Sequence, residues 1–452
     1  MMSLPFLLPA LALGVGVALL FLSQRLTLQA WFSFAAAALI AGVLMFPDLF
    51  VVLGLPLVGD GWGLPGRVSV ELVPGLSAWW LGLAALSPIA RWSTRAFSPW
   101  FLPQAWLVAG IWQIALIDDP PLAGIVAGVL ALAVAAPLLT VRGRPMAGGG
   151  PLFYAVLCLT LLLIANWQAQ LSVAEPGVIE HALAATLALG IGCMLLLGAF
   201  PFHLWSPALE PDADTGQVAL VALVLQPAAL LMTLTLAQEL SWFRSPLGVS
   251  GLRLAGLISV LAAGAMAFGE LRLERVLGHA LLLDVGAALL AITGQGPLDR
   301  QLVLAAIGVR VLGSVAWAAG LTTLRSHRES GTLSLIGVGL RFPLATAAFL
   351  AGPLAIGGHP LLAGFPLRWA LLVDRGPTDP VLALAVLVGL IGIGFATFRS
   401  LTQLISPAGE AATLRFEDRG WPALIALAAL AALLLAASYP QFWFWLFPVP
   451  GG

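Results

Sequence analysis

Long apolar runs, separated by short polar or glycine- and proline-rich stretches, follow one another along the whole chain. A helix needs about 20 mostly apolar residues to cross a bilayer, and cutting the chain at its charges and Gly/Pro clusters predicts about fourteen such segments. They are 4–21, 28–46, 76–90, 100–117, 121–140, 152–170, 182–205, 217–239, 252–269, 277–293, 301–324, 342–374, 380–398 and 421–447. The twelfth is too long for one plain helix and contains two Gly/Pro clusters, so we expect a kink or two packed pieces.

Composition supports the same fold class. Hydrophobic residues make up 60% of the chain and charged residues 9%, a balance that excludes a soluble fold because too few charges are available to cover its surface. The sequence therefore predicts an all-α polytopic membrane protein with the lipid bilayer as its solvent. A net charge of -1 provides no basic surface for a nucleic-acid partner. Cys158 and Cys193 lie inside apolar runs, where we expect them to pack without forming a disulfide or a metal site.

Arginine placement predicts the orientation of the chain. All 20 basic residues are arginines: thirteen lie in loops after odd-numbered segments, five in loops after even-numbered ones, and two, Arg310 and Arg368, inside predicted segments. Because cytoplasmic loops are enriched in basic residues, the odd loops are predicted to be cytoplasmic and both termini outside. The polar stretch 406–419 is then a cytoplasmic connector, with an amphipathic surface helix as an alternative.

Two short stretches resemble each other. Residues 198–205 read GAFPFHLW and residues 363–369 read AGFPLRW, so each places Phe-Pro and a basic residue beside tryptophan. Proline breaks at corresponding places in two halves point to an inverted-repeat transporter with its site at the breaks. Pro201 and Pro366 therefore predict two interrupted helices related by a two-fold axis in the membrane plane. A chance similarity remains the alternative, because Gly and Pro are common in membrane helices.

Three motifs resemble a known family. Residues 201–207, PFHLWSP, resemble the Pro-Phe-His-x-Trp-x-Pro signature of the antiporter-like subunits of respiratory complex I. Residues 274–279, ERVLGH, resemble that family's Lys-Arg-x-Leu-(Ala/Gly)-Tyr, and residues 358–369, GHPLLAGFPLRW, resemble its Gly-x-Pro-x-x-Ala-Gly-Phe-x-x-Lys-Phe. The resemblance covers about 100–399 and favours the N-type subunit before the M-type.

The resemblance implies a fold and a setting. The fold is fourteen transmembrane helices with two inverted five-helix repeats, each containing a broken helix. The implied divisions are amino-terminal helices at 1–99, a first repeat at 100–240, a second at 252–399, and a connector with the last helix at 400–452. The implied setting is the membrane arm of a bacterial inner-membrane NADH:quinone oxidoreductase, among other membrane-arm subunits. This chain would bind no cofactor, and NADH, FMN, iron–sulfur clusters and quinone would belong to partner subunits.

The family moves protons along buried ionisable residues, and this chain departs from that pattern. The family's glutamate falls near Ala127 or Gly128, and its two lysines fall on Leu196 and Gln226. Its later Lys or Glu falls on Arg368, the only charged residue at the four carried-over positions. Leucine cannot take up a proton and arginine essentially cannot release one, so the usual lysine relay cannot operate here.

Other ionisable residues remain inside the predicted segments and are candidates for a rerouted proton path. They are His203, His279, Asp284, Arg310 and Arg368, with Glu239 near an outer end. Asp284 and Arg310 fit either a structural ion pair or a relay, and Arg368 fits either bonding to broken-helix carbonyls or an electrostatic gate. His203 is placed to cap a helix end. Asp284 follows His279 by five residues, which separates their directions by about 140° on a helix, so they are not a tight pair.

The turn at 270–275 contains Glu270, Arg272, Glu274 and Arg275 and is predicted to be a solvated cytoplasmic loop. Three functional hypotheses stay open at this point. The chain conducts protons by a rerouted path, or it is a proton-inactive structural spacer, or it serves a different assembly. Such assemblies are a membrane hydrogenase, a cation/proton antiporter or an inorganic-carbon uptake complex.

Overall fold

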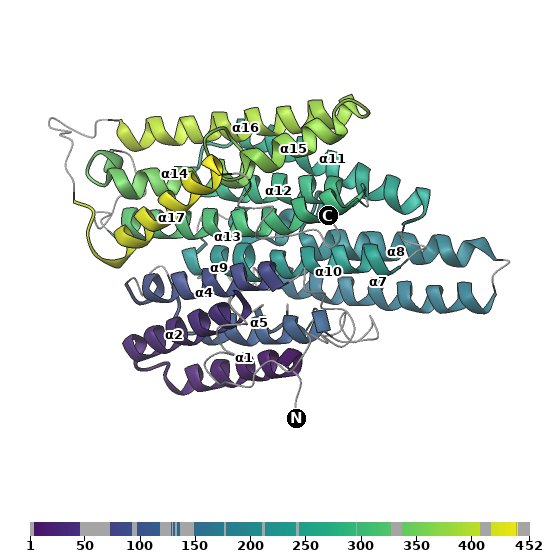
Figure 1. Ribbon diagram of the computed structural model, residues 1–452, viewed down its shortest axis with the longest axis horizontal. Helices are drawn as coiled ribbons and strands as arrows, with labels where there is room; N and C mark the ends of the chain where they lie inside the picture. The colour runs from purple at the N-terminus through teal and green to yellow at the C-terminus, as the bar shows by residue number, and fades with distance from the viewer. Residues whose placement is uncertain are drawn as a thin grey trace.

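The computed structural model describes most of the chain as helices that run roughly along one direction (Figure 1). The described residues are 4–45, 73–92, 97–117, 149–175, 178–209, 213–240, 244–294, 296–326, 337–406 and 417–439, with 128, 130, 131, 133–135 and 441. Nine helices within these residues are long and apolar enough to cross a membrane. The predicted segment 121–140 falls largely outside the described residues.

The helices form three groups in chain order. The first group contains α1 (Leu4–Phe21), α2 (Leu26–Met45), α4 (Val73–Trp92) and α5 (Phe101–Ile117). The second contains α7 (Gly149–Ala174), α8 (Ile179–Leu197), α9 (Thr215–Leu220) and α10 (Gln226–Glu239), with the π-helical turn η5 (Val221–Leu225) joining the last two. The third contains α11 (Pro246–Gly269), α12 (Val276–Ile292), α13 (Pro297–Ser326), α14 (Pro343–Gly357), α15 (Phe365–Arg375), α16 (Pro380–Ile405) and α17 (Gly420–Ser438). The short helices are η3 (Phe202–Trp205), η4 (Pro207–Leu209), η7 (Leu273–Arg275) and η8 (Val338–Leu340).

The most buried helices are those that hold the polar residues discussed below. The spans Thr215–Ala237, Leu273–Ile292 and Leu298–Ser326 are each 94% buried, whereas Phe153–Ala174 is 17% buried. In Figure 1, α12 and α13 lie between the amino-terminal helices on one side and α16 on the other. Gln226 of α10, Asp284 of α12 and Arg310 of α13 are accordingly buried inside the protein, as intramembrane charges require.

Glycines allow several helices in the third group to touch through their backbones. A Cβ on Gly264 of α11 would lie 2.7 Å from the Cα of Gly389 on α16. Gly256 of α11 and Gly286 of α12 face each other, and a Cβ on either would lie 2.8 Å from the other's carbonyl oxygen. Small residues at such crossings let helices approach closely, and this close packing drives helix association where lipid removes the hydrophobic effect.

Two helices are interrupted, as the Phe-Pro repeats predict. Helix α8 ends at Leu197, where Gly198 adopts a left-handed conformation with φ 65°, and the chain continues through the short helix η3. The predicted segment 342–374 consists of two helices, α14 and α15, separated by a break that starts at Gly358 with φ 94°. The interruption of both helices is thus confirmed, while the two-fold relation between them stays a prediction.

The predicted connector is only partly described, because residues 407–416 lie outside the described residues. Asp418, just beyond them, accepts hydrogen bonds at 3.0 Å from the backbone N–H groups of Leu344 and Ala345. Its carboxylate thereby satisfies free donors at the start of α14, where a negative charge also complements the helix dipole. Glu417 pairs with Arg341 at 2.8 Å. These contacts fix the segment before α17 to the start of the second interrupted helix.

Candidate functional site: a buried ionic network between two helix breaks

Asp284 of α12 lies at the centre of the site and is 2% exposed. Arg310 of α13, which is fully buried, donates to one carboxylate oxygen from Nε at 2.8 Å and from Nη2 at 2.5 Å. Nη2 of Arg310 also reaches the carbonyl of Leu281 at 3.4 Å. The sequence predicted this pair as one of two alternatives for Asp284 and Arg310, and the two side chains do form a two-pronged ion pair between adjacent helices.

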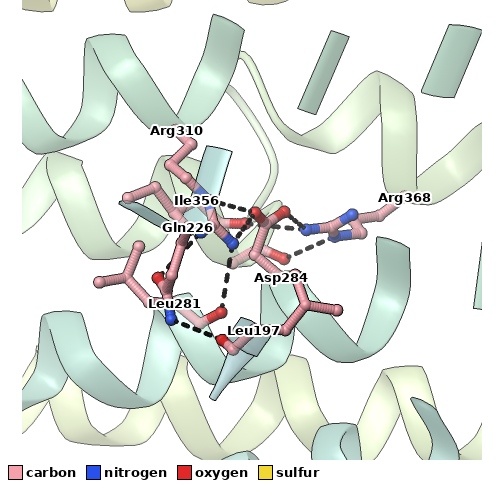
Figure 2. Close-up of polar contacts among 8 residues, drawn as sticks. Leu197, Gln226, Leu281, Asp284, Arg310, Ile356 and Arg368 are labelled. Atoms are coloured by element: carbon pink, nitrogen blue, oxygen red, sulfur yellow. Dashed lines mark hydrogen bonds and ion pairs between the residues drawn. The ribbon is translucent and has the colours of Figure 1, made fainter. Parts of the chain in front are cut away.

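Arg368 of α15 binds the other carboxylate oxygen of Asp284 through Nη2 (Figure 2). The same guanidinium donates to the carbonyl of Ile356 at 3.2 Å and to that of Gly357 at 3.4 Å. These carbonyls end α14, where helix geometry leaves acceptors without intrahelical donors. Arg368 therefore bonds the broken-helix carbonyls, which was one of its predicted roles, and it pairs with Asp284 at the same time.

The second break is shaped around Arg368. A Cβ on Gly358 would collide with the aliphatic stem of Arg368, and the positive φ of Gly358 also favours glycine. Glycine at this position thus turns the chain and leaves the room that the arginine needs.

Gln226 connects this cluster to the first break. Its amide oxygen accepts from Nη1 of Arg310 at 2.9 Å, and its amide nitrogen donates to the carbonyl of Leu197 at 3.1 Å. Leu197 is the last residue of α8. Gln226 follows directly after the π-helical turn η5, a local widening that often marks functional sites in helices.

A continuous set of hydrogen bonds thus runs from the carbonyl of Leu197 to that of Ile356, and we call it the central network. It passes through Gln226, Arg310, Asp284 and Arg368. Figure 2 shows these side chains converging from different helices. The central network therefore links the two interrupted helices through buried polar side chains.

The charges of the central network are unequal. It contains two guanidinium cations and one carboxylate anion. Arginine stays protonated in proteins, so the two cations cannot store or release a proton. Gln226 is a neutral amide, so Asp284 is the only side chain of the network whose chemistry lets it gain or lose a proton.

Apolar side chains occupy or border the other two positions at which the family places an ionisable residue. Leu196 is 5% exposed and belongs to the buried core. A Cβ on Gly128 would lie 2.8 Å from the ring of Trp112, so the tryptophan occupies the space that a longer side chain at Gly128 would need. A glutamate would not fit there without displacing that ring.

The two predicted histidines do not join the central network. His203 lies on η3, just after the first break, and stacks on Phe200 with ring centroids 5.2 Å apart. His279 lies at the start of α12 and contacts Glu270 at 3.3 Å rather than Asp284, in agreement with the predicted divergence of the two side chains. The side chain of Glu239 lies outside the described residues. Among the described residues, no group of three His, Cys, Asp or Glu side chains is placed to hold a metal ion.

Comparison with known proteins identifies the family. The family model described as "NADH:quinone oxidoreductase/Mrp antiporter, TM" matches residues 147–394. The chain belongs to this family. The match includes both helix breaks and every residue of the central network, so this network lies inside the antiporter-like region.

Relatives of the family fall into more than one kind of complex. NADH-quinone oxidoreductase subunit N of Methylococcus capsulatus is 29% identical over 256 residues, 54% of this chain and 51% of the relative. Formate hydrogenlyase subunit 3 of Escherichia coli is 30% identical over 197 residues, 40% of this chain and 32% of the relative. The chain spans about half the length of the first of these relatives.

Solved structures share the fold over nearly the full chain. A chain of the Mrp complex from Dietzia has a TM-score of 0.79 at 15% identity, covering 98% of this chain and 96% of its own. A chain of respiratory complex I from Thermus thermophilus with bound NADH has a TM-score of 0.71 at 21% identity, covering 98% of both chains. At these identities the likeness concerns the fold alone.

Placing a lysine at position 226, where the family has one, should destabilise this antiporter-like chain. In Gln226→Lys the ammonium would replace an amide oxygen that lies 2.9 Å from Arg310, adding a third cation to a buried network that is already positive. We expect a loss of about 2 kcal/mol or more in the free energy of unfolding, since a buried charge without a partner is costly.

Gln226→Glu is the matched control, because glutamate has nearly the size of glutamine and a charge opposite to that of lysine. This variant should lose less stability than Gln226→Lys. Thermal unfolding of the purified variants in detergent measures the difference. A lysine variant as stable as the glutamate variant would contradict the assignment of a net positive centre.

Proposed function

We propose that this chain is a membrane-arm subunit of a bacterial respiratory NADH:quinone oxidoreductase that resembles complex I. Family membership and similarity to subunit N of such an enzyme support this role. The chain would sit in the inner membrane among other membrane-arm subunits. NADH, FMN, iron–sulfur clusters and quinone belong to the partner subunits in this proposal.

The finer architecture belongs to the same proposal. It comprises fourteen transmembrane helices, both termini outside, and inverted five-helix repeats at 100–240 and 252–399. The amino-terminal helices at 1–99 and the connector with the last helix at 400–452 flank these repeats. Support comes from the two helix breaks, one in each proposed repeat, which lie at the two ends of the central network.

The central network is the observation that carries the proposed mechanism. Because Asp284 is its only group able to gain a proton, proton movement through the central network would use this carboxylate or water beside it. Protonation of Asp284 would remove the charge that holds Arg310 and Arg368 together. Arg368 could then move relative to α12 while keeping its bonds to the end of α14, which couples one proton to the geometry of the second break.

A proton-inactive spacer is the second candidate. Two observations favour it: the partners of the single carboxylate are two guanidiniums that cannot release a proton, and Leu196 removes one proton-binding position. A third candidate is service in another antiporter-like complex, which the similarity to formate hydrogenlyase subunit 3 and to a chain of the Mrp complex favours.

Proton flux in vesicles containing the whole complex tests the proposal. The double variant Asp284→Asn/Arg368→Gln removes the carboxylate and one cation, so the net charge of the central network stays the same. We expect this variant to lower flux by at least tenfold. The matched control is Asp379→Asn/Arg253→Gln, which also removes one carboxylate and one cation but at a more exposed ion pair outside the central network, and which should keep most of the flux.

Normal flux in the double variant would exclude a path through Asp284. If the complex that contains the double variant assembles normally and its proton flux equals that of the unmodified complex, the spacer candidate is correct. Proton flux that depends on a second cation would favour the third candidate.

A further inference from the structure

Three tryptophans from separate helices lie together at the end of the molecule drawn at the left of Figure 1, where α2 and α17 begin. They are Trp31 of α2, Trp92 of α4 and Trp421 of α17, and we call them the tryptophan patch. The rings of Trp31 and Trp421 meet edge to face with centroids 5.4 Å apart. A Cβ on Gly420 would collide with the ring of Trp92, so this ring lies against the start of α17. The patch thus joins the first and third groups of helices.

The tryptophan patch lies where helices enter the membrane. The candidate spans Leu26–Met45 and Gly420–Ser438 both begin beside it. Trp31, Trp92 and Trp421 are 38%, 46% and 43% exposed, so each ring faces the surroundings of the protein. Tryptophan is enriched at the two surfaces of a bilayer, where its ring meets the lipid headgroups. The position and exposure of the patch therefore place it at the level of the headgroups.

Two arginines flank the tryptophan patch. Arg91 precedes Trp92 in the last turn of α4, and Arg419 precedes Gly420 at the start of α17. Both are exposed. Neither makes an ion pair or a side-chain hydrogen bond with any residue that the structure describes. A guanidinium has five N–H donors, so these two side chains present donors and positive charge that the protein itself does not use.

Negative charge is missing around the patch. Residues 19–34 and 86–106 contain no Asp or Glu, and their arginines are Arg25, Arg91 and Arg95. The two acidic residues that precede α17 are engaged elsewhere. Glu417 pairs with Arg341, and Asp418 accepts from the N–H groups at the start of α14. This part of the surface is therefore positive and complements an anion.

A small recess between α2, α4 and α5 adds polar groups beside Arg91. Gln29, Arg91 and Ser98 are among the residues that line it. The hydroxyl oxygen of Ser98 accepts from the backbone N–H of Trp100 at 3.3 Å, which leaves its hydrogen free to donate. A guanidinium and a hydroxyl that both donate outward suit the oxygens of a phosphate group.

Apolar side chains continue from the patch toward the middle of the membrane. Phe34 follows Trp31 by three residues and Leu424 follows Trp421 by three, so each shares a helix face with its tryptophan. Phe34 is 38% exposed and Leu424 is 59% exposed. Positive charge at the membrane surface and apolar side chains below it match the headgroup and the acyl chains of a lipid. An acidic protein segment would match the charge and leave the apolar part without a partner.

The turn at 270–275 shows that arginines elsewhere are neutralised within the protein. Arg275 lies 3.5 Å from Glu270, whose side chain is 12% exposed, so the prediction of a solvated loop is wrong for Glu270. Glu274 lies 4.0 Å from Arg325 of α13. The turn contains two glutamates and two arginines, and it therefore presents no net positive charge to an anion.

We propose that the tryptophan patch, with Arg91 and Arg419, binds the headgroup of an anionic phospholipid. The two guanidiniums donate to the phosphate oxygens, the indole rings border the headgroup, and the acyl chains lie along Phe34 and Leu424. The bound lipid fastens α17 to the first group of helices. The inference requires that the chain spans a membrane, and it does not depend on proton movement through the central network.

Native mass spectrometry of the purified full chain in detergent counts the lipids that stay bound when phosphatidylglycerol or phosphatidylcholine is added. The two lipids carry the same phosphate and can have the same acyl chains, but only phosphatidylglycerol has a net negative charge. We expect the unmodified chain to bind phosphatidylglycerol at least tenfold more tightly. Arg91→Gln/Arg419→Gln should remove this preference, because the cations that attract the anionic headgroup are lost.

Arg244→Gln/Arg272→Gln is the matched control, since it removes two exposed arginines that lie away from the patch. This control should keep the preference for phosphatidylglycerol. In lipid-free detergent Arg91→Gln/Arg419→Gln should unfold at the same midpoint as the unmodified chain, because neither side chain makes a bond that would be lost. Equal binding of the two lipids by the unmodified chain would overturn the inference. A preference that Arg91→Gln/Arg419→Gln retains, or that the control loses equally, would also overturn it.

Photo-cross-linking in the whole complex tests the occupant of the patch in its membrane. With benzoylphenylalanine in place of Trp92, we expect illumination to attach a phospholipid to this chain. An adduct with a partner protein and none with lipid would assign the patch to a protein interface and overturn the inference. Both readouts are independent of flux, so the lipid site and the proposed function can fail separately.

Discussion

Replacing Asp284 with alanine should destabilise the chain by on the order of 3–5 kcal/mol, one of the largest effects expected from a single substitution in this protein. Asp284 is the shared counter-ion of Arg310 and Arg368, and both arginines are buried. Without the carboxylate, two cations would remain in a water-poor interior and repel each other. The free energy of unfolding, measured for the purified chain in mixed micelles, reports this loss.

A second substitution separates charge from packing. If unpaired charge causes the loss, adding Arg368→Met to Asp284→Ala should recover part of the lost stability, because only one cation then remains and it keeps its bond to Gln226. Arg368→Met alone should cost stability, because the carbonyl of Ile356 loses its donor and Asp284 loses one of its two partners. A loss below about 1 kcal/mol for Asp284→Ala would contradict the assignment of Asp284 as the anion that holds the centre together.

Gly264→Leu should disrupt the contact between α11 and α16, with an expected cost of about 3 kcal/mol or more. A Cβ at this position would lie 2.7 Å from the Cα of Gly389 and 2.8 Å from the carbonyl oxygen of Val388. Both are backbone atoms that cannot rotate away, so the helices must separate. Loss of the folded chain from detergent extracts and a lowered unfolding midpoint measure the effect.

Gly251→Leu provides the matched control on the same helix. Its added Cβ would meet nothing within 4 Å, so the substitution should be tolerated within about 0.5 kcal/mol. Equal losses in the two variants would indicate that leucine disturbs α11 itself. The packing explanation would then be wrong.

The sequence predicted helices and breaks well because both follow from local chemistry. Long apolar runs predict membrane helices wherever they occur. Proline lacks the N–H that a helix requires, and glycine tolerates a left-handed turn, so the Phe-Pro motifs near Gly198 and Gly358 predicted both interruptions. Exact ends were less accurate: the predicted segment starts at 182, whereas α8 starts at Ile179 and ends at Leu197, before Pro201.

The sequence predicted several residues of the site but not which of them contact one another. The sequence named Asp284, Arg310 and Arg368 as candidates because charges inside apolar segments need partners. It did not connect Arg368 to Asp284, which lies 84 residues away in the chain. Gln226 was recognised only as a substituted lysine position, although it bridges Arg310 and the end of α8.

The sequence by itself therefore determined that this is a helical membrane protein with two interrupted helices and without the family's lysine relay, since residue type and local spacing decide these properties. Only the tertiary structure decided that one carboxylate pairs with two arginines, and that the partly buried Glu270 contacts His279. Both facts depend on which helices become neighbours. Helix neighbours are set by packing at small residues such as Gly264 and Gly286, and that packing brings together side chains whose separation along the chain contains no periodic signal.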